Sequence, residues 1–171
     1  MTQAMTWAQA LLFCFQNELQ APHPKPILPQ HVMLRPGQQV TPLLSTNDDE
    51  CCRGLGWVRV ASVSGVRELN STLAVDARCF SQERVLTLEL GAARCAPTPG
   101  PAGLPSEDEW TALAMVLDAD MNAMERAVCC AFGDDVDGVG DVAVGDYEPF
   151  GQDGNCIGGT MTVRITMEAC C

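Results

Sequence analysis

The chain has 171 residues, of which 47% are hydrophobic, and a formal net charge of −12 at pH 7. This length and composition predict one globular domain, residues 1–171, with a hydrophobic core of its own. The negative charge argues against sequence-specific binding of DNA, because the phosphate backbone is also negative. No apolar run approaches the roughly 20 residues of a membrane-spanning helix, so we expect no membrane contact.

The acidic residues are concentrated in the second half of the chain. Residues 1–96 contain eight Lys and Arg and eight Asp and Glu, whereas residues 97–171 contain two basic and fourteen acidic residues. Solubility is the simplest explanation of this charge. The alternative is a surface past which nucleic acid slides without sticking.

The N-terminal part of the chain predicts a helix followed by an extended connector. Apolar residues recur every four positions over residues 3–20, which is typical of one buried helix stripe. Pro22 ends this helix, and residues 21–50 form a proline-rich connector with a short edge strand at 31–34. The N-terminus has no Lys or Arg before Lys25. It therefore lacks the basic start of a secretory signal, and we expect synthesis in the cytoplasm.

Two segments with alternating hydrophobicity follow, at residues 56–63 and 83–95. In the second segment Leu86, Leu88 and Leu90 alternate with more polar residues. This period of two predicts β-strands, and we expect the two strands to form an antiparallel pair. Residues 96–105, rich in proline and glycine, predict a linker.

The second half predicts a long helix, a long loop and a final strand. Ser106 and Glu109 fit a capping box at the start of a helix over residues 105–133. Its apolar stripe consists of Trp110, Leu113, Leu117, Met121, Met124 and Val128. Residues 133–160 predict an acidic, glycine-rich loop, and residues 161–167 a strand. Together the elements predict an α+β fold in which two principal helices pack on one face of a mainly antiparallel sheet.

No motif indicates an active site, a cofactor or a metal. The ten cysteines include no Cys-x-x-Cys pair, and His23 and His31 both lie in the connector. The acidic loop contains Asp134, Asp135, Asp137, Asp141 and Asp146, but its glycine spacing differs from that of a calcium-binding EF-hand. We therefore expect a non-enzymatic protein, in which these aspartates lie in a solvated loop.

Adjacent cysteines occur three times, as Cys51-Cys52, Cys129-Cys130 and Cys170-Cys171. If the last strand runs antiparallel to the 56–63 strand, then Cys51, Cys52, Cys95, Cys170 and Cys171 share one end of the sheet, and Cys129 and Cys130 could join them. In a reducing cytoplasm such a cluster is apolar packing. In an extracellular particle it could oxidise to disulfides, for example between Cys51 or Cys52 and Cys170 or Cys171.

The order of these elements resembles that of tail terminator (tail completion) proteins of bacteriophages with long, non-contractile tails. The segments "CCRGLGWVRV", "LTLELGAARCAP", "AVCC" and "GNCIGGTMTVRITME" are similar to versions from phages of actinobacteria. The resemblance covers most of the chain as architecture.

This resemblance implies a virion protein of the tail neck, assembled in the host cytoplasm. Its expected partners are further copies of itself in a ring, usually a homohexamer, the tail tube protein and the head-side connector or stopper protein. The ring would end tube growth and let genomic DNA pass through its lumen without specific binding. The acidic residues named above would then face the lumen or an interface. Another head-to-tail connector or minor tail subunit is the first alternative, and a thiol-dependent binding or redox protein is the second.

Overall fold

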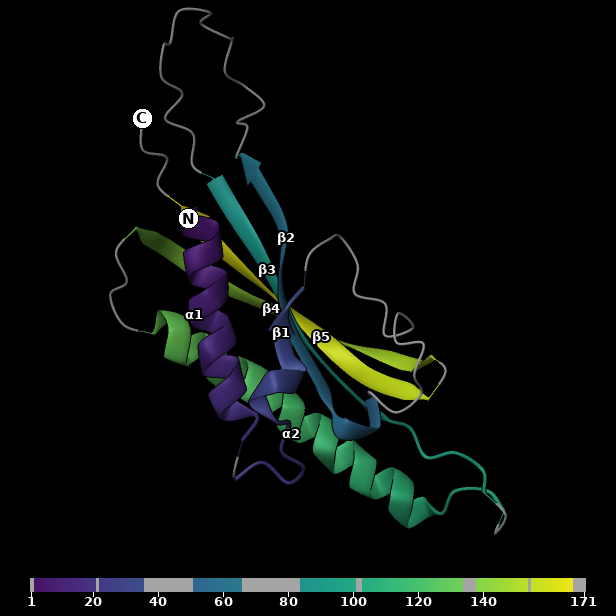
Figure 1. The fold of residues 1–171 in the computed structure, drawn as a ribbon. Coiled ribbons are helices and arrows are strands. Elements are labelled where there is room, and N and C mark those ends of the chain that lie inside the picture. Colours follow the sequence, from purple (N-terminus) through teal and green to yellow (C-terminus); the bar gives the residue numbers. More distant parts are fainter. Residues whose placement is uncertain are drawn as a thin grey trace, which may run out of the picture.

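The computed structural model describes residues 2–20, 22–35, 51–65, 84–100, 103–133, 138–153 and 155–167. Within these ranges the chain forms two α-helices and a five-stranded sheet with the order β1-β2-β3-β5-β4 (Figure 1). The strands are β1 (Val32–Leu34), β2 (Leu55–Gly65), β3 (Arg84–Cys95), β4 (Val139–Asp153) and β5 (Cys156–Met167). The β1–β2 pair is parallel and the other pairs are antiparallel. The predicted α+β fold is confirmed.

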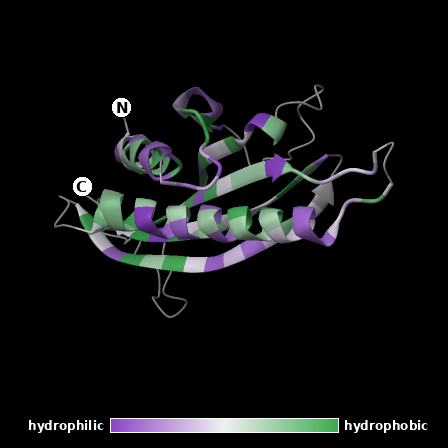
Figure 2. Ribbon diagram, turned by 90° about the horizontal axis from the view of Figure 1, so that it is seen from below, coloured by the Kyte–Doolittle hydropathy of each residue, from purple (hydrophilic) through white to green (hydrophobic). Residues whose placement is uncertain are grey.

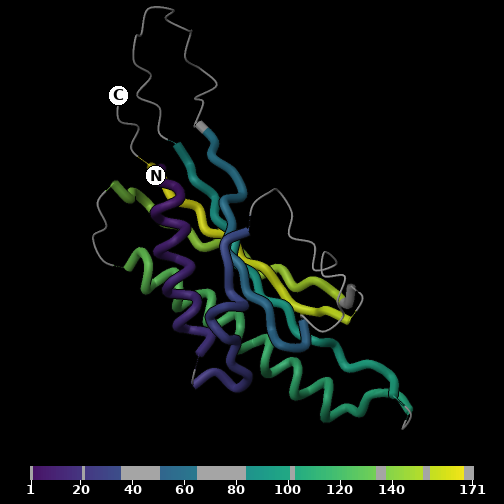
Figure 3. The backbone as a smooth tube through the Cα atoms, viewed as in Figure 1, coloured from purple at the N-terminus to yellow at the C-terminus, as the bar shows by residue number. Residues whose placement is uncertain are grey.

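Helix α1 (Gln3–Glu18) buries the predicted stripe. Trp7, Leu11, Phe15 and Leu19 are each at most 4% exposed. The chain then turns through Pro22 to a short 3-10 turn, η1 (Pro29–His31), and to β1, the predicted edge strand. Figure 3 follows α1 where it passes over α2, the second helix, and α1 also packs against β1 and β2.

The main core lies between the helices and one face of the sheet. Strand β3 is in the centre, and its Leu86, Leu88 and Leu90 are fully buried. These residues pair in register with Ile165, Val163 and Met161 of β5, so the same face continues across both strands. Alternation along β3 and β5 therefore predicts the buried face correctly, because both strands are covered by helices on that side only.

Helix α2 (Glu107–Phe132) begins at the predicted capping box. The Ser106 backbone N–H donates to Glu109 Oε2 at 2.7 Å, and the Glu109 backbone N–H donates to the Ser106 hydroxyl at 3.3 Å. Hydrogen bonds from the backbone N–H and the hydroxyl of Ser106 lower the pKa of the Glu109 carboxyl, because they stabilise its charged form. The first turn of α2 is thus firmly defined and carries negative charge.

The apolar stripe of α2 is covered only in part. Leu113, Met124 and Val128 are buried, whereas Trp110 is 41% exposed. Figure 2 shows hydrophobic and hydrophilic residues alternating along α2, and in Figure 1 the N-terminal end of this helix extends past the sheet. Trp110 therefore follows the sequence pattern of the stripe without contributing to the buried core.

The expectation of a loop over residues 133–160 is wrong for most of its length. Residues 139–153 form the edge strand β4, which pairs with β5. The pairing register shifts three times, between Val139 and Val142, Val144 and Tyr147, and Phe150 and Asp153. Each irregularity interrupts the period-two alternation, so the strand pattern cannot be recognised in the sequence.

A small second cluster lies on the opposite face of the sheet, around Trp57. The indole is fully buried and lies directly across Gly91, where an added Cβ would be 2.2 Å from the ring. The ring of Phe150 stacks on Trp57 with a centroid separation of 6.3 Å. The Trp57 Nε1–H donates to Glu89 Oε1 at 3.2 Å, so the polar tip of this side chain is also satisfied.

Candidate functional site

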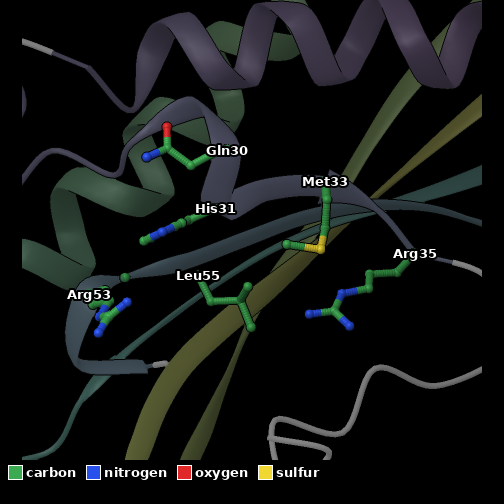
Figure 4. Close-up of a pocket in the computed structure, with 7 residues that line it drawn as sticks. Gln30, His31, Met33, Arg35, Arg53 and Leu55 are labelled. Atoms are coloured by element: carbon green, nitrogen blue, oxygen red, sulfur yellow. The ribbon is translucent and has the colours of Figure 1, made fainter. Parts of the chain in front are cut away.

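A basic cavity lies at the β1 edge of the sheet. It has a volume of about 450 Å³ and is lined by Gln30, His31, Met33, Arg35, Arg53, Gly54 and Leu55. Figure 4 shows Met33 and Leu55 between Arg53 on one side and Arg35 on the other. This volume is within the range of about 300–1,000 Å³ that is typical of binding clefts. We call these residues the basic pocket.

Three segments of chain position the basic pocket. Parallel pairing of β1 with β2 places Met33 opposite Trp57, so Met33 lies on the sheet face away from the helices. The short turn η3 (Cys51–Arg53) brings Arg53 to the same edge. Gly54 follows with a φ of +80°, and a Cβ there would be 2.8 Å from Ile27 Cγ1. The tight turn between Arg53 and Leu55 therefore requires glycine.

The charge of the basic pocket is opposite to that of the whole chain. Among the residues that the structure describes, Arg35 and Arg53 have no carboxylate within ion-pair distance. The Nε atom of Arg35 is buried and has no acceptor in the same part of the chain. A buried donor without an acceptor is costly, and an arginine fork binds a carboxylate well. The basic pocket is therefore suited to an acidic group with an apolar neighbour.

A second exposed feature is the N-terminal part of α2 together with Leu104, which lies three residues before the helix. Leu104 is 86% exposed, Trp110 is 41% exposed and Met115 is 67% exposed. Glu107 and Asp108 are exposed in the same first turn. We call Leu104, Glu107, Asp108, Trp110 and Met115 the helix tip. Exposed tryptophan and methionine beside charge are typical of a protein-binding surface.

A buried ionic group lies beneath α2. Arg94 is fully buried, and its Nε–H donates to Asp120 Oδ2 at 2.8 Å while Nη2 pairs with Oδ1. A further guanidinium N–H donates to the Lys25 carbonyl at 2.8 Å. His23 Nε2 lies 3.1 Å from Asp120 Oδ1, close but poorly aligned for a hydrogen bond, while Nδ1 accepts from the Lys25 N–H at 3.1 Å. The group ties the connector, β3 and α2 together, and its burial gives it a structural role.

Tyr147 of β4 is influenced by the charge of Asp120 in this buried ionic group. Burial, with a contribution from the charge of Asp120, raises the pKa of Tyr147 from 10.0 to about 12. The folded state thus favours the neutral phenol. The resulting stabilisation is fully present below pH 10 and is lost as the pH rises toward 12.

We expect the tyrosinate absorbance of the folded protein to appear near pH 12, and that of the chain unfolded in guanidinium chloride near pH 10. Tyr147 is the only tyrosine of the chain, so a spectrophotometric titration measures this group alone. A Tyr147→Phe variant supplies the baseline. Titration of the folded protein near pH 10 would contradict the buried position of the phenol.

The cysteines form three disulfides among the described residues. Cys51 pairs with Cys156 and Cys52 with Cys95, at Cα–Cα distances of 5.6 and 4.3 Å. Both tie η3 to the ends of neighbouring strands. Their shared end of the sheet is the predicted corner for Cys51, Cys52 and Cys95, with Cys156 as a member that sequence reasoning missed.

The other predicted members of that corner are placed differently. Cys130 pairs with Cys14, which joins α2 to α1 at a Cα–Cα distance of 5.9 Å, and Cys129 is exposed with a free thiol. Cys170 and Cys171 lie outside the described residues. The proposed pairing of Cys51 or Cys52 with them is wrong, because both already have other partners.

The direction of the last strand explains this correction. Both β2 and β5 are antiparallel to β3, so β5 runs in the same direction as β2 and not against it. Met167, the last residue of β5, pairs with Arg84 at the end of β3 that is remote from Cys95. The strand therefore carries the chain away from the disulfide corner.

The predicted acidic residues are described only in part. Asp141 and Asp146 lie on β4 and are exposed, so they are on an edge strand and not in a loop. Asp134, Asp135 and Asp137 lie outside the described residues. In the described part of the chain, no group of three or more His, Cys, Asp and Glu side chains is arranged to hold a metal ion.

Sequence reasoning missed the most informative surface residues. Arg35 and Arg53 are far apart in the chain, and only the β1–β2 pairing brings them to one edge. The sequence indicated only weakly that Cys14 is buried, because this residue lies beside the apolar stripe of α1 and not in it. Neither helix in the described residues combines the length and the apolar composition of a membrane span.

Comparisons with other proteins assign no family to the chain. No protein-family model matches the chain, and no curated protein matches it.

Proposed function

We propose that the chain is a structural virion subunit that forms a homohexameric ring at the head-proximal end of the tail tube of a long-tailed phage. The ring ends tube polymerisation and joins the tail to the head-side connector, and DNA passes through its lumen. The proposal starts from the segments that resemble tail terminator proteins. In the fold these segments contribute to η3 with β2, the central strand β3, the C-terminal part of α2 and the inner strand β5.

The observation that carries the proposal is the helix tip. Three of the exposed large apolar residues, Leu104, Trp110 and Met115, lie in or just before the first half of α2, and Trp110 is the exposed tryptophan among them. An exposed tryptophan beside charged residues typically marks an interface, because aromatic anchors often dominate binding. A ring subunit needs such a surface toward its neighbour, whereas a soluble monomer gains nothing from it.

Two further features support an extracellular assembly around a polyanion. The three disulfides suit a particle that leaves the reducing cytoplasm after lysis. Asp141 and Asp146 are exposed on the edge strand β4, and a lumen lined by such residues would repel DNA and keep it from sticking.

We expect the purified chain to have a solution mass six times the chain mass of 18.3 kDa. Size-exclusion chromatography with light scattering measures the mass, and negative-stain electron microscopy shows whether the particles are rings with a central hole. A monomer that persists at high concentration would contradict the proposal.

The position in the neck is tested with the tail tube protein. A stopper or minor tail subunit could also form a ring, so ring formation alone does not identify a terminator. Purified chain added to polymerising tail tube protein should shorten the tubes and cap one end, seen by electron microscopy with an antibody label. Unchanged tube length together with labelling of the head connector would assign the chain to the alternative, a stopper.

A further inference from the structure

The helix tip and the basic pocket have complementary chemistry. The helix tip combines exposed apolar side chains with Glu107 and Asp108, which have no cationic partner among the described residues. The basic pocket combines Met33 and Leu55 with Arg35 and Arg53. Each surface thus presents apolar side chains beside charges that have no ion-pair partner in the described part of the chain, and the two charges are opposite.

We propose that the helix tip of one copy docks in the basic pocket of the next copy. Trp110 covers Met33 and Leu55, while Glu107 and Asp108 pair with Arg35 and Arg53 of the neighbouring chain. This inference rests on the proposed ring, for which it identifies the contact between subunits. The occupant of the basic pocket is therefore a second copy of the same chain.

The positions of the two surfaces suit a head-to-tail contact. The helix tip belongs to the helical layer and extends past the sheet, whereas Met33 lies on the opposite face of the sheet (Figures 1 and 4). Each copy can therefore offer its helix tip to one neighbour and its basic pocket to another. A contact between two different surfaces forms a ring when the rotation closes.

The energetics favour the docked state for two reasons. Burial of the Trp110 indole removes apolar surface from water, and aromatic anchors of this kind often dominate an interface. The buried Nε–H of Arg35, which has no acceptor within the described chain, gains one from an incoming carboxylate. Glu109 remains with Ser106, so the helix start is retained on docking.

The test uses charge reversal on each side of the contact. One variant carries Arg35→Glu and Arg53→Glu, and the other carries Glu107→Lys and Asp108→Lys. We expect each alone to weaken association at least about 100-fold, because like charges would then face each other. Both pairs of substitutions in one chain should restore the ring. An equimolar mixture of the two variants should also restore it, with the variants alternating, as native mass spectrometry can show.

Two controls identify the source of any effect. Glu125→Lys reverses an exposed acidic residue on the same helix outside the helix tip, and it should leave the ring intact. The triple variant Asp48→Asn, Asp49→Asn, Glu50→Gln removes acidic residues that precede the basic pocket in the sequence. Near-ultraviolet circular dichroism confirms that each variant is folded.

The outcomes distinguish a failure of this contact from a failure of the proposed function. A monomeric wild-type chain overturns the ring itself. A wild-type ring that persists in both charge-reversal variants leaves the ring standing and overturns this contact. Failure of the combined variant to reassemble also overturns it. The triple variant should leave the ring intact. If it dissociates the ring while the charge-reversal variants do not, residues 48–50 and not the helix tip are needed for the contact, and the proposed occupant is wrong.

Discussion

Reduction of the three disulfides is expected to bring the protein close to unfolding at room temperature. The pairs Cys14–Cys130, Cys51–Cys156 and Cys52–Cys95 span 116, 105 and 43 residues. Native disulfides typically contribute about 2–4 kcal/mol each, mainly by restricting the unfolded chain. Their combined loss is comparable to the total stability of about 5–15 kcal/mol of an ordinary domain.

The measurement is thermal unfolding by circular dichroism with and without a reductant. We expect a large fall of Tm on reduction, and a smaller fall for the double variant Cys52→Ser, Cys95→Ser alone. Cys129→Ser is the matched control, because this thiol is free and exposed and its loss should leave Tm unchanged. Mass spectrometry of unreduced protein should find Cys129 alkylated and the three pairs intact. Alkylation of all these cysteines in the native protein would contradict the pairing.

Asp120→Ala should lower the free energy of unfolding by about 3–5 kcal/mol. The carboxylate receives two hydrogen bonds from Arg94, which is fully buried, so its removal leaves an uncompensated charge in the core. The effect differs from that of a surface ion pair such as Arg126–Glu18, whose arginine side chain is 55% exposed and contributes little.

Denaturation in guanidinium chloride without reductant measures this change. Glu125→Ala, on the exposed side of the same helix, should stay within about 0.5 kcal/mol of the wild type. The double variant Arg94→Met, Asp120→Leu should recover much of the stability, because it removes both charges together. A loss of less than 1 kcal/mol in Asp120→Ala would show that the Arg94 charge finds compensation elsewhere.

Elements with a regular pattern were predictable from the sequence. The stripe of α1, the capping box of α2 and the alternation of β3 and β5 are local features, and these elements lie where their patterns placed them, except that β5 begins at Cys156, inside the predicted loop. Such elements bury one continuous face, so the hydrophobic period is retained in the sequence. Strand β4 was missed because its pairing register shifts three times and its outer edge faces solvent.

The candidate site could not be derived in the same way. Arg35 and Arg53 belong to no sequence motif. They come to the same edge of the sheet only when β1 pairs in parallel with β2. Likewise, Cys156 reaches Cys51 only because β4 and β5 form a hairpin that ends beside β3. The predicted partners Cys170 and Cys171 depended on the direction of the last strand, which no local pattern encodes.

The sequence by itself thus determined the α+β class, the helices, the central strands and the face of each that is buried. These properties follow from the periodic placement of apolar residues, which is a local property of the chain. Only the tertiary structure decided which cysteines pair, which aromatic residue stays exposed and where the basic pocket lies. Those outcomes depend on strand order and direction, and so on contacts between residues that are distant in the chain.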